Sequence, residues 1–176
     1  MRLFIAIPLP DAVKNYMEEL QGNLHGSMSF PKKEAMHLTL FFIGDFDDVE
    51  LIKNKLKSIN HEPFSLTTDA VGVLGSTHFL RIVYLALKDS SELKNLVTAI
   101  EKTLPVKKDK PFFPHLTLAR IKYLSEDERT VLKNTIQQIN KNNQTIPFSV
   151  DSIILYSSEL QKSGAVHTAL ETYMLK

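Results

Sequence analysis

The sequence HLTL occurs twice, at residues 37–40 and again at residues 115–118, 78 residues further along the chain. Each copy lies in an apolar run short enough to be a β-strand, residues 36–44 in the first case and 114–121 in the second. Side chains at positions i and i+2 of a strand point to the same face. Each copy therefore places an imidazole and a threonine hydroxyl on one face, and two leucines on the face that helices can bury.

If the two copies face one another, they enclose a cleft with two imidazoles and two hydroxyls. Two histidines with pKa values near 6.5 can hold opposite protonation states near neutral pH, and so form a proton-transfer pair. The hydroxyls can donate hydrogen bonds to an anion held between the imidazoles. A lone strand histidine is usually structural, but two copies in one register argue against coincidence. The pattern predicts His37, His115, Thr39 and Thr117 as catalytic residues.

The composition is that of an ordinary globular protein, with 43% hydrophobic and 23% charged residues among 176. A net charge of +1 provides no overall field toward nucleic acid or membrane, so a nucleic-acid substrate would have to be read locally, in a site, and would be short or an end. The absence of cysteine excludes a disulfide framework and a cysteine nucleophile. The first apolar run, residues 3–7, is too short for a signal peptide or a membrane span. We therefore expect a cytoplasmic protein that does not associate with membranes.

Two other catalytic chemistries find little support in the sequence. A catalytic zinc usually needs a third protein ligand, and the polar face of neither HLTL strand offers one within four residues. A serine hydrolase would need a G-x-S-x-G turn, which the chain lacks. We expect no metal, no cofactor and no obligate protein partner.

Hydrophobic periodicity predicts an alternation of strands and helices. Strands are expected at 2–8, 36–44, 64–74, 79–87, 114–121, 148–156 and 166–175, and helices at about 11–24, 47–59, 89–104 and 125–139. Two helix starts carry a capping residue followed by an acid, at residues 89–92 and 125–128. A polar loop is expected at 31–34.

The two halves of the chain look like a duplication, because their first strands are separated by about the same offset as the HLTL copies. This predicts an α+β fold with two pseudo-symmetric lobes, each a small antiparallel sheet with two outer helices. The sheets would face a central catalytic groove. The whole chain, 1–176, would be one domain, with lobe one at about 1–77 and lobe two at about 78–176.

The chain resembles the two-histidine phosphoesterase superfamily over nearly its whole length, and within it the RNA 2',3'-cyclic phosphodiesterases, also called 2'-5' RNA ligases. The resemblance rests on MRLFIAI at 1–7, HLTLFFIG at 37–44, PHLTLAR at 114–120 and SSEL with a following glycine at 157–164. Phe41 stands where the family usually has a basic residue. His167 stands where the family commonly has tyrosine, so no role is transferred to it.

The resemblance implies metal-independent hydrolysis of RNA 2',3'-cyclic phosphate ends to 2'-phosphomonoesters. It further implies that His37 is the proton donor, that His115 is the proton acceptor, and that Thr39 and Thr117 hold the phosphate. The partners would be RNA or oligonucleotide ends that carry a cyclic phosphate. One alternative is an ATP-independent 2'-5' RNA ligase that uses the same histidines. Another is an RNA- or nucleotide-binding module with vestigial catalysis, against which the intact histidines and threonines argue.

Further residues near the two motifs are candidates for substrate binding. Basic loops precede both motif strands, and they are either solvated or form a positive rim that receives the RNA backbone. One of the phenylalanines beside the motifs could stack on the terminal base, and an arginine beyond the second motif either contacts the phosphate or forms a surface salt bridge. These candidates are Arg120, Phe42, Lys32, Lys33, Lys107, Lys108 and Lys110.

Overall fold

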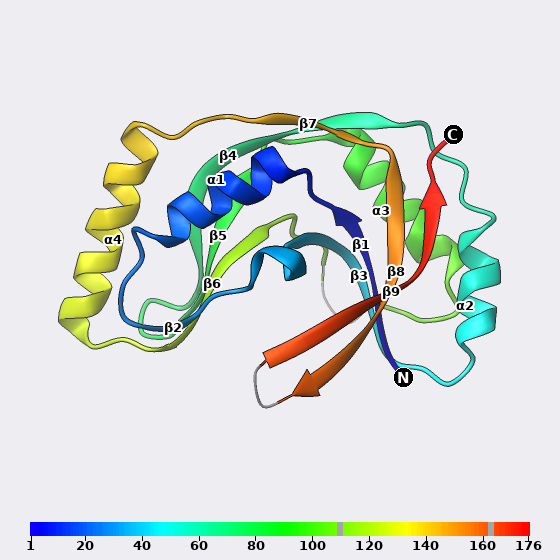
Figure 1. Cartoon of the computed structure of the whole chain (residues 1–176), viewed down its shortest axis with the longest axis horizontal. Helices are drawn as coiled ribbons and strands as arrows, with labels where there is room; N and C mark the ends of the chain where they lie inside the picture. The colour runs from blue at the N-terminus through cyan, green and yellow to red at the C-terminus, as the bar shows by residue number, and fades with distance from the viewer. Residues whose placement is uncertain (109–110, 162–163) are drawn as a thin grey trace.

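Two antiparallel sheets and four α-helices make up the described part of the chain, residues 1–108, 111–161 and 164–176 of this computed structural model (Figure 1). The strands are β1 (Arg2–Pro8), β2 (Ser27–Ser29), β3 (His37–Asp45), β4 (Phe64–Gly75), β5 (Leu80–Leu87), β6 (Leu116–Tyr123), β7 (Pro147–Val150), β8 (Ser152–Gln161) and β9 (Gly164–Met174). The helices are α1 (Asp11–Gln21), α2 (Val49–Leu56), α3 (Ser91–Thr103) and α4 (Glu126–Lys141). A short 3-10 helix spans Lys33–Ala35.

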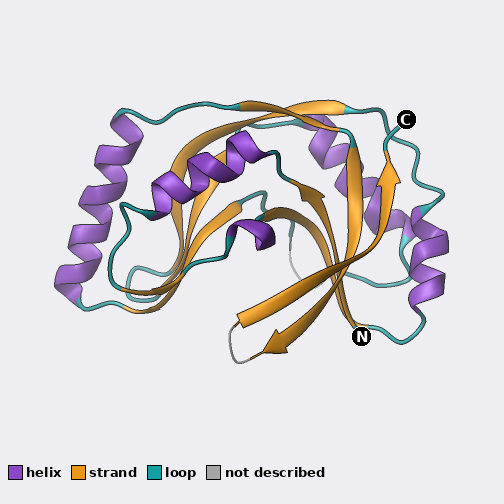
Figure 2. Ribbon diagram, viewed as in Figure 1, coloured by secondary structure: helices purple, strands orange, loops and turns teal. Residues whose placement is uncertain are grey.

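Each sheet carries two of these helices. One sheet has four strands in the order β3-β1-β8-β9, and the other has five in the order β2-β6-β5-β4-β7. Helix α3 packs on β3 and α2 packs on α3, while α1 contacts β6 and α4 contacts β4. Figure 2 shows the helices distributed between the two sheets in this way. The predicted α+β class with two sheets and two helices for each sheet is confirmed.

The two sheets do not correspond to consecutive halves of the chain. The four-stranded sheet combines β1 and β3 with β8 and β9, and the five-stranded sheet combines β2 and β4 with β5, β6 and β7. The boundary predicted near residue 77 therefore does not separate the sheets. The reason is that β4 forms a hairpin with β5 and also pairs with β7, while β1 pairs with both β3 and β8. These pairings link distant segments, which a reading of local periodicity does not detect.

The single strand predicted at 148–156 is wrong, because the chain changes sheets at Asp151. Residues before this position form β7 and pair with β4, whereas residues after it form β8 and pair with β1. The loop predicted at 31–34 also differs, since it contains the start of the 3-10 helix. Strand β2, which the periodicity did not predict, pairs with β6 and forms one edge of the five-stranded sheet.

Helix starts follow the capping chemistry of the sequence. The Ser125 hydroxyl oxygen accepts a hydrogen bond from the Glu128 backbone N–H at 3.2 Å, and a Glu128 carboxylate oxygen accepts from the Ser125 N–H at 2.8 Å. This reciprocal pair is the capping box that the S-x-x-E pattern predicts. Helix α3 is capped by Ser90, whose hydroxyl oxygen accepts from the Leu93 N–H at 3.1 Å, one residue later than predicted.

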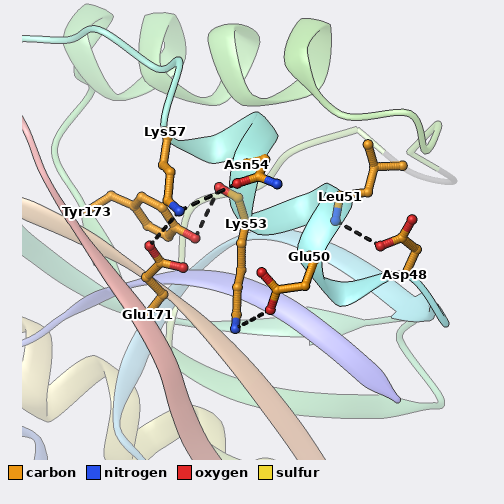
Figure 3. A network of polar contacts seen from close by, with 8 residues as sticks. All are labelled: Asp48, Glu50, Leu51, Lys53, Asn54, Lys57, Glu171 and Tyr173. Atoms are coloured by element: carbon orange, nitrogen blue, oxygen red, sulfur yellow. Dashed lines mark hydrogen bonds and ion pairs between the residues drawn. The ribbon is translucent and has the colours of Figure 1, made fainter.

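Polar contacts hold α2 against β9, at the edge of the four-stranded sheet (Figure 3). The Tyr173 hydroxyl donates to the Lys53 carbonyl oxygen at 3.4 Å, and the Lys57 ammonium lies 3.6 Å from a Glu171 carboxylate oxygen. Burial, and then the charge of Glu171, raise the pKa of Tyr173, so this hydroxyl stays a donor. Because Glu171 and Tyr173 belong to β9, these contacts join the last strand to a helix from the first half of the chain.

The leucines of both HLTL copies are buried, as predicted. Leu38, Leu40, Leu116 and Leu118 are at most 1% exposed, and all belong to the hydrophobic core. Alternation along each strand then directs the intervening threonines to the opposite face. Among the described residues, no helix is long and apolar enough to cross a membrane.

Candidate active site

A groove of about 590 Å³ lies between the two sheets, and both HLTL copies contribute to it. His37 and Thr39 line it from β3, and Thr117 lines it from β6. His115 also lines the groove, from the residue that immediately precedes β6. The fold thus brings together four polar side chains that the sequence places 78 residues apart in two pairs.

Both imidazoles are oriented by the same local hydrogen bond. Nδ1 of His37 lies 2.7 Å from the carbonyl oxygen of Ala35, and Nδ1 of His115 lies 2.8 Å from the carbonyl oxygen of Phe113. A carbonyl oxygen only accepts, so each Nδ1 carries its hydrogen and donates it. The remaining nitrogen of each ring, Nε2, is a lone-pair acceptor in the neutral ring and a donor in the charged ring. Each ring can therefore exchange a proton through Nε2.

A threonine hydroxyl is hydrogen-bonded to the first of these rings. Nε2 of His37 lies 3.0 Å from Oγ1 of Thr39, two residues further along the same face of β3. When His37 is neutral, its Nε2 has only a lone pair to offer, so the hydroxyl donates to the ring. The i and i+2 spacing of the motif thus produces a direct contact between its histidine and its threonine.

His37 is packed among aromatic rings, and its burial disfavours its charged form. Its ring centroid is 4.9 Å from that of Phe4, 6.1 Å from that of Tyr156 and 5.3 Å from that of His167. Burial lowers the pKa of His37 to about 4. The hydrogen bond to the Ala35 carbonyl acts in the opposite direction, and the neighbouring basic side chains, Arg120 and the two other groove histidines, act in the same direction as burial. With this pKa, His37 is neutral at pH 7. A proton donor at this position must first acquire its proton.

His115 has a different aromatic environment. Its ring centroid lies 6.1 Å from that of Tyr84 on β5 and 5.9 Å from that of Phe113. The Tyr84 ring lies across β4 at Gly72, where an added Cβ would come within 2.5 Å of the tyrosine hydroxyl. A glycine at this position therefore allows Tyr84 to lie where it contacts His115. The two histidines share one orienting hydrogen bond but differ in what surrounds them.

The structure separates the other candidate residues into two groups. Arg120, Phe42 and Lys32 line the groove. Phe42 is 50% exposed, and the Arg2 guanidinium lies 5.0 Å from the centre of its ring. An exposed ring with a cation on one face is a surface on which a nucleobase can stack.

Three other basic candidates, Lys33, Lys107 and Lys108, are not among the described residues that line the groove. Lys33 pairs with Glu18 at 3.2 Å and also contacts Asn15. Lys108 pairs with Glu101 at 2.6 Å and lies 5.0 Å from the centre of the Phe112 ring. Lys107 is exposed, and Lys110 lies outside the described residues.

Several groove residues had no role in the prediction from sequence. Arg2 and Phe4 come from β1, and His167 comes from β9, whose register places it opposite Ser158. The pairing of β1 with β3 sets Phe4 opposite Phe42. Pairing between distant strands leaves no periodic pattern in the sequence. The one feature that could have indicated His167 was its place on the predicted last strand. Among residues 1–108, 111–161 and 164–176, no three histidine, aspartate or glutamate side chains form a cluster suited to a metal ion.

Residues 9–162 match the sequence model of the 2'-5' RNA ligase superfamily. An RNA 2',3'-cyclic phosphodiesterase of Methanocaldococcus jannaschii is 24% identical over 176 residues, which cover 98% of this chain and 100% of that protein.

Solved structures share the fold over almost the whole chain. The crystal structure of TT0787 of Thermus thermophilus aligns with a TM-score of 0.80 and 22% identity, covering 99% of this chain and 98% of that one. E. coli LigT complexed with 3'-AMP aligns with a TM-score of 0.75 and 20% identity, covering 99% of this chain and 97% of that one.

Proposed function

Since the chain belongs to the 2'-5' RNA ligase superfamily, we propose that it hydrolyses RNA 2',3'-cyclic phosphate ends to 2'-phosphomonoesters without a metal ion. Relatives that are named RNA 2',3'-cyclic phosphodiesterases, at 24% to 29% identity, support a phosphodiesterase. The observation that carries the proposal is the pair of imidazoles in one groove. Each holds its Nδ1 hydrogen on a backbone carbonyl and keeps Nε2 for proton transfer.

The reaction assigns one proton transfer to each histidine. Water attacks phosphorus, and Nε2 of His115 takes the proton that the water loses. The bond between phosphorus and the 3' oxygen breaks, and Nε2–H of His37 gives its proton to that oxygen. The product carries a 2'-phosphate and a 3'-hydroxyl, and the two histidines have exchanged protonation states. Strain in the five-membered ring supplies part of the driving force, so the scheme needs no Lewis acid.

Substrate binding would prepare His37 for its role as donor. The cyclic phosphate is an anion, and a negative charge beside a buried imidazole favours the imidazolium. As the proton enters on Nε2, this nitrogen no longer accepts from Thr39, and the threonine hydroxyl can turn to a phosphate oxygen. Thr117 and Arg120, which line the same groove, would be further donors to the phosphate.

The exposed ring of Phe42 suits the base of the terminal nucleotide. The ring lies on the groove wall, and the Arg2 guanidinium lies over one of its faces. A base of any identity could stack on such a ring, because stacking does not distinguish one base from another. Lys32 at the same groove would meet the RNA backbone. The proposed substrate is thus the end of an RNA chain and not an extended duplex.

The deciding experiment is product analysis with an oligonucleotide that ends in a 2',3'-cyclic phosphate, in the presence of EDTA. We expect a 2'-phosphate product from the wild-type protein. His37→Ala and His115→Ala should each lower kcat by about 10²–10⁴-fold, because each removes one proton transfer. The double variant should lose much less than the product of the single losses, since either deletion already stalls the coupled transfer.

His78→Ala is a matched control, because His78 is exposed and lies in the turn before β5. It should keep full activity. A joined product in the presence of a 5'-hydroxyl oligonucleotide would show a ligase instead. Turnover that disappears with EDTA and returns with zinc or manganese would contradict the metal-free scheme, and near-normal turnover in both single variants would make the motif structural.

A further inference from the structure

A third imidazole lines the groove beside the proposed catalytic pair. His167 projects from β9, and its ring centroid lies 5.3 Å from that of His37 and 4.9 Å from that of Phe4. Among the described residues, Nδ1 of His167 is the one buried side-chain nitrogen or oxygen that has no hydrogen-bond partner. The proposed reaction assigns no role to His167.

The unpaired nitrogen restricts the form that this ring can take. A buried N–H without an acceptor costs the desolvation free energy of that donor, and both the charged ring and the Nδ1–H tautomer would place such a donor here. The tautomer with its hydrogen on Nε2 leaves only a lone pair at the buried position.

Charges around the ring also favour its neutral form. Among the described residues, the His37 ring on β3 lies beside it and the charge of Arg120 on β6 acts on it, and both groups carry a positive charge or no charge. Burial lowers the pKa of His167, and the Arg120 guanidinium lowers it further. A neutral ring with its hydrogen on Nε2 is consistent with both the packing and the charges.

We propose that His167 is a neutral hydrogen-bond donor to the substrate, and that its Nε2–H binds a non-bridging oxygen of the phosphate. This inference rests on the proposed function, because it names a further contact within the same groove. A neutral donor has a specific advantage beside His37. A charged ring 5.3 Å away would oppose the protonation that His37 needs, whereas a neutral ring binds the anion without competing for that proton.

Two amide substitutions separate the two ring nitrogens. In His167→Gln the amide group occupies a place close to that of Nε2, and in His167→Asn it occupies a place close to that of Nδ1. The probe is inorganic phosphate, whose affinity is measured by calorimetry at pH 7. We expect His167→Gln to bind phosphate almost as well as the wild type, and His167→Asn and His167→Phe to bind it about tenfold or more weakly, as for the loss of one hydrogen bond to a charged group.

The matched control is His78→Gln, which makes the same chemical change at an exposed site outside the groove and should leave phosphate binding unchanged. Thermal unfolding of each variant identifies any that fails to fold. Nitrogen-15 NMR of the histidine rings provides an independent measurement that needs no substitution. We expect the His167 ring to be neutral at pH 7, with hydrogen on Nε2 and none on Nδ1.

Two results would overturn the inference: a charged His167 ring at pH 7, or equal phosphate binding by the wild type, His167→Asn and His167→Phe. Neither measurement depends on turnover. If the wild type does not open a cyclic phosphate but the glutamine and asparagine variants still differ, the donor role stands and the proposed reaction fails. If the wild type is active and the variants do not differ, the donor role fails alone.

Discussion

The hydroxyl oxygen of Thr39 lies 3.0 Å from Nε2 of His37, at the ring nitrogen that the proposed reaction uses. When His37 is neutral, the hydroxyl therefore donates a hydrogen bond to the lone pair of Nε2. The same hydroxyl is a candidate donor to the phosphate once His37 is charged. The Thr39 hydroxyl would thus donate to Nε2 of the neutral His37 ring, and to the phosphate when that ring is charged.

Replacing Thr39 by valine tests this double role, because valine keeps the branched shape that suits a strand and removes only the hydroxyl. We expect Thr39→Val to lower kcat by about 10- to 100-fold, the loss of one hydrogen bond to a charged group, and so by less than the loss of either histidine. Steady-state kinetics with a cyclic-phosphate substrate is the measurement. Thr77→Val, in the exposed turn after β4, is the control. Unchanged kcat in Thr39→Val would remove the hydroxyl from the reaction.

The assignment of proton donor and acceptor can be tested by counting protons. His37 has a pKa of about 4 in the free protein, so the donor role requires proton uptake when the anion binds. We expect His115→Ala, which should bind a nucleoside 2',3'-cyclic phosphate with strongly reduced turnover, to take up about one proton at pH 6. Calorimetry in buffers of different ionisation enthalpy measures this number. The double variant with His37→Gln should take up none. Binding of the cyclic phosphate to His115→Ala without proton uptake would instead make His37 the acceptor.

Stability should fall in acid because of the same histidine. The folded-state pKa of His37 is lowered from 6.5 to about 4, so between these values the unfolded chain binds a proton that the folded chain excludes. The free energy of unfolding should therefore decrease as pH falls from about 6.5 to about 4, by up to about 3 kcal/mol from this residue. Urea unfolding at pH 7, 5.5 and 4 measures the change.

The matched variant for this test is His37→Gln, which cannot titrate in this range. Its stability should depend less on pH than that of the wild type, by the amount assigned to His37. The pKa of His167 is lowered as well, so a smaller dependence of the same sign should remain. Equal pH dependence in the wild type and in His37→Gln would show that the groove does not hold His37 neutral.

The lysines near the groove should differ in their effect on RNA binding. Lys32 lines the groove, whereas Lys33 and Lys108 are paired with Glu18 and Glu101. Lys32→Ala should raise KM for an oligonucleotide and reduce the slope of log affinity against log salt by about 0.7, the share of one contact to a single strand. Lys33→Ala and Lys108→Ala are internal controls and should leave the slope unchanged. If all three variants behave alike, Lys32 makes no specific contact with the RNA backbone.

Local patterns predicted the features of this protein that depend on neighbouring residues. Two-residue alternation placed the motif leucines in the core, and the S-x-x-E pattern predicted the capping box at Ser125. The two HLTL copies indicated four residues that the structure brings into one groove, although their roles remain predictions that the variants above test.

Features that depend on pairing between distant strands could not be predicted in this way. No glycine or proline marks Asp151, where the chain leaves one sheet and enters the other. The position of His167 beside His37 depends on the order β3-β1-β8-β9, which only the complete sheet defines. The low pKa of His37 likewise results from burial among residues of three different strands.

The interleaved sheets have a consequence for the order in which the protein can assemble during translation. Both HLTL copies have been synthesised by residue 118, but β1 still lacks its partner β8, which begins at Ser152. Until then one side of an apolar strand, Leu3 to Ile7, has unpaired backbone groups that can associate with other chains. The groove also lacks the wall that β9 provides. The groove should thus be complete only after β9 (Gly164–Met174) has been synthesised, and the edge of β1 in a nascent chain should stay open to association until β8 is available.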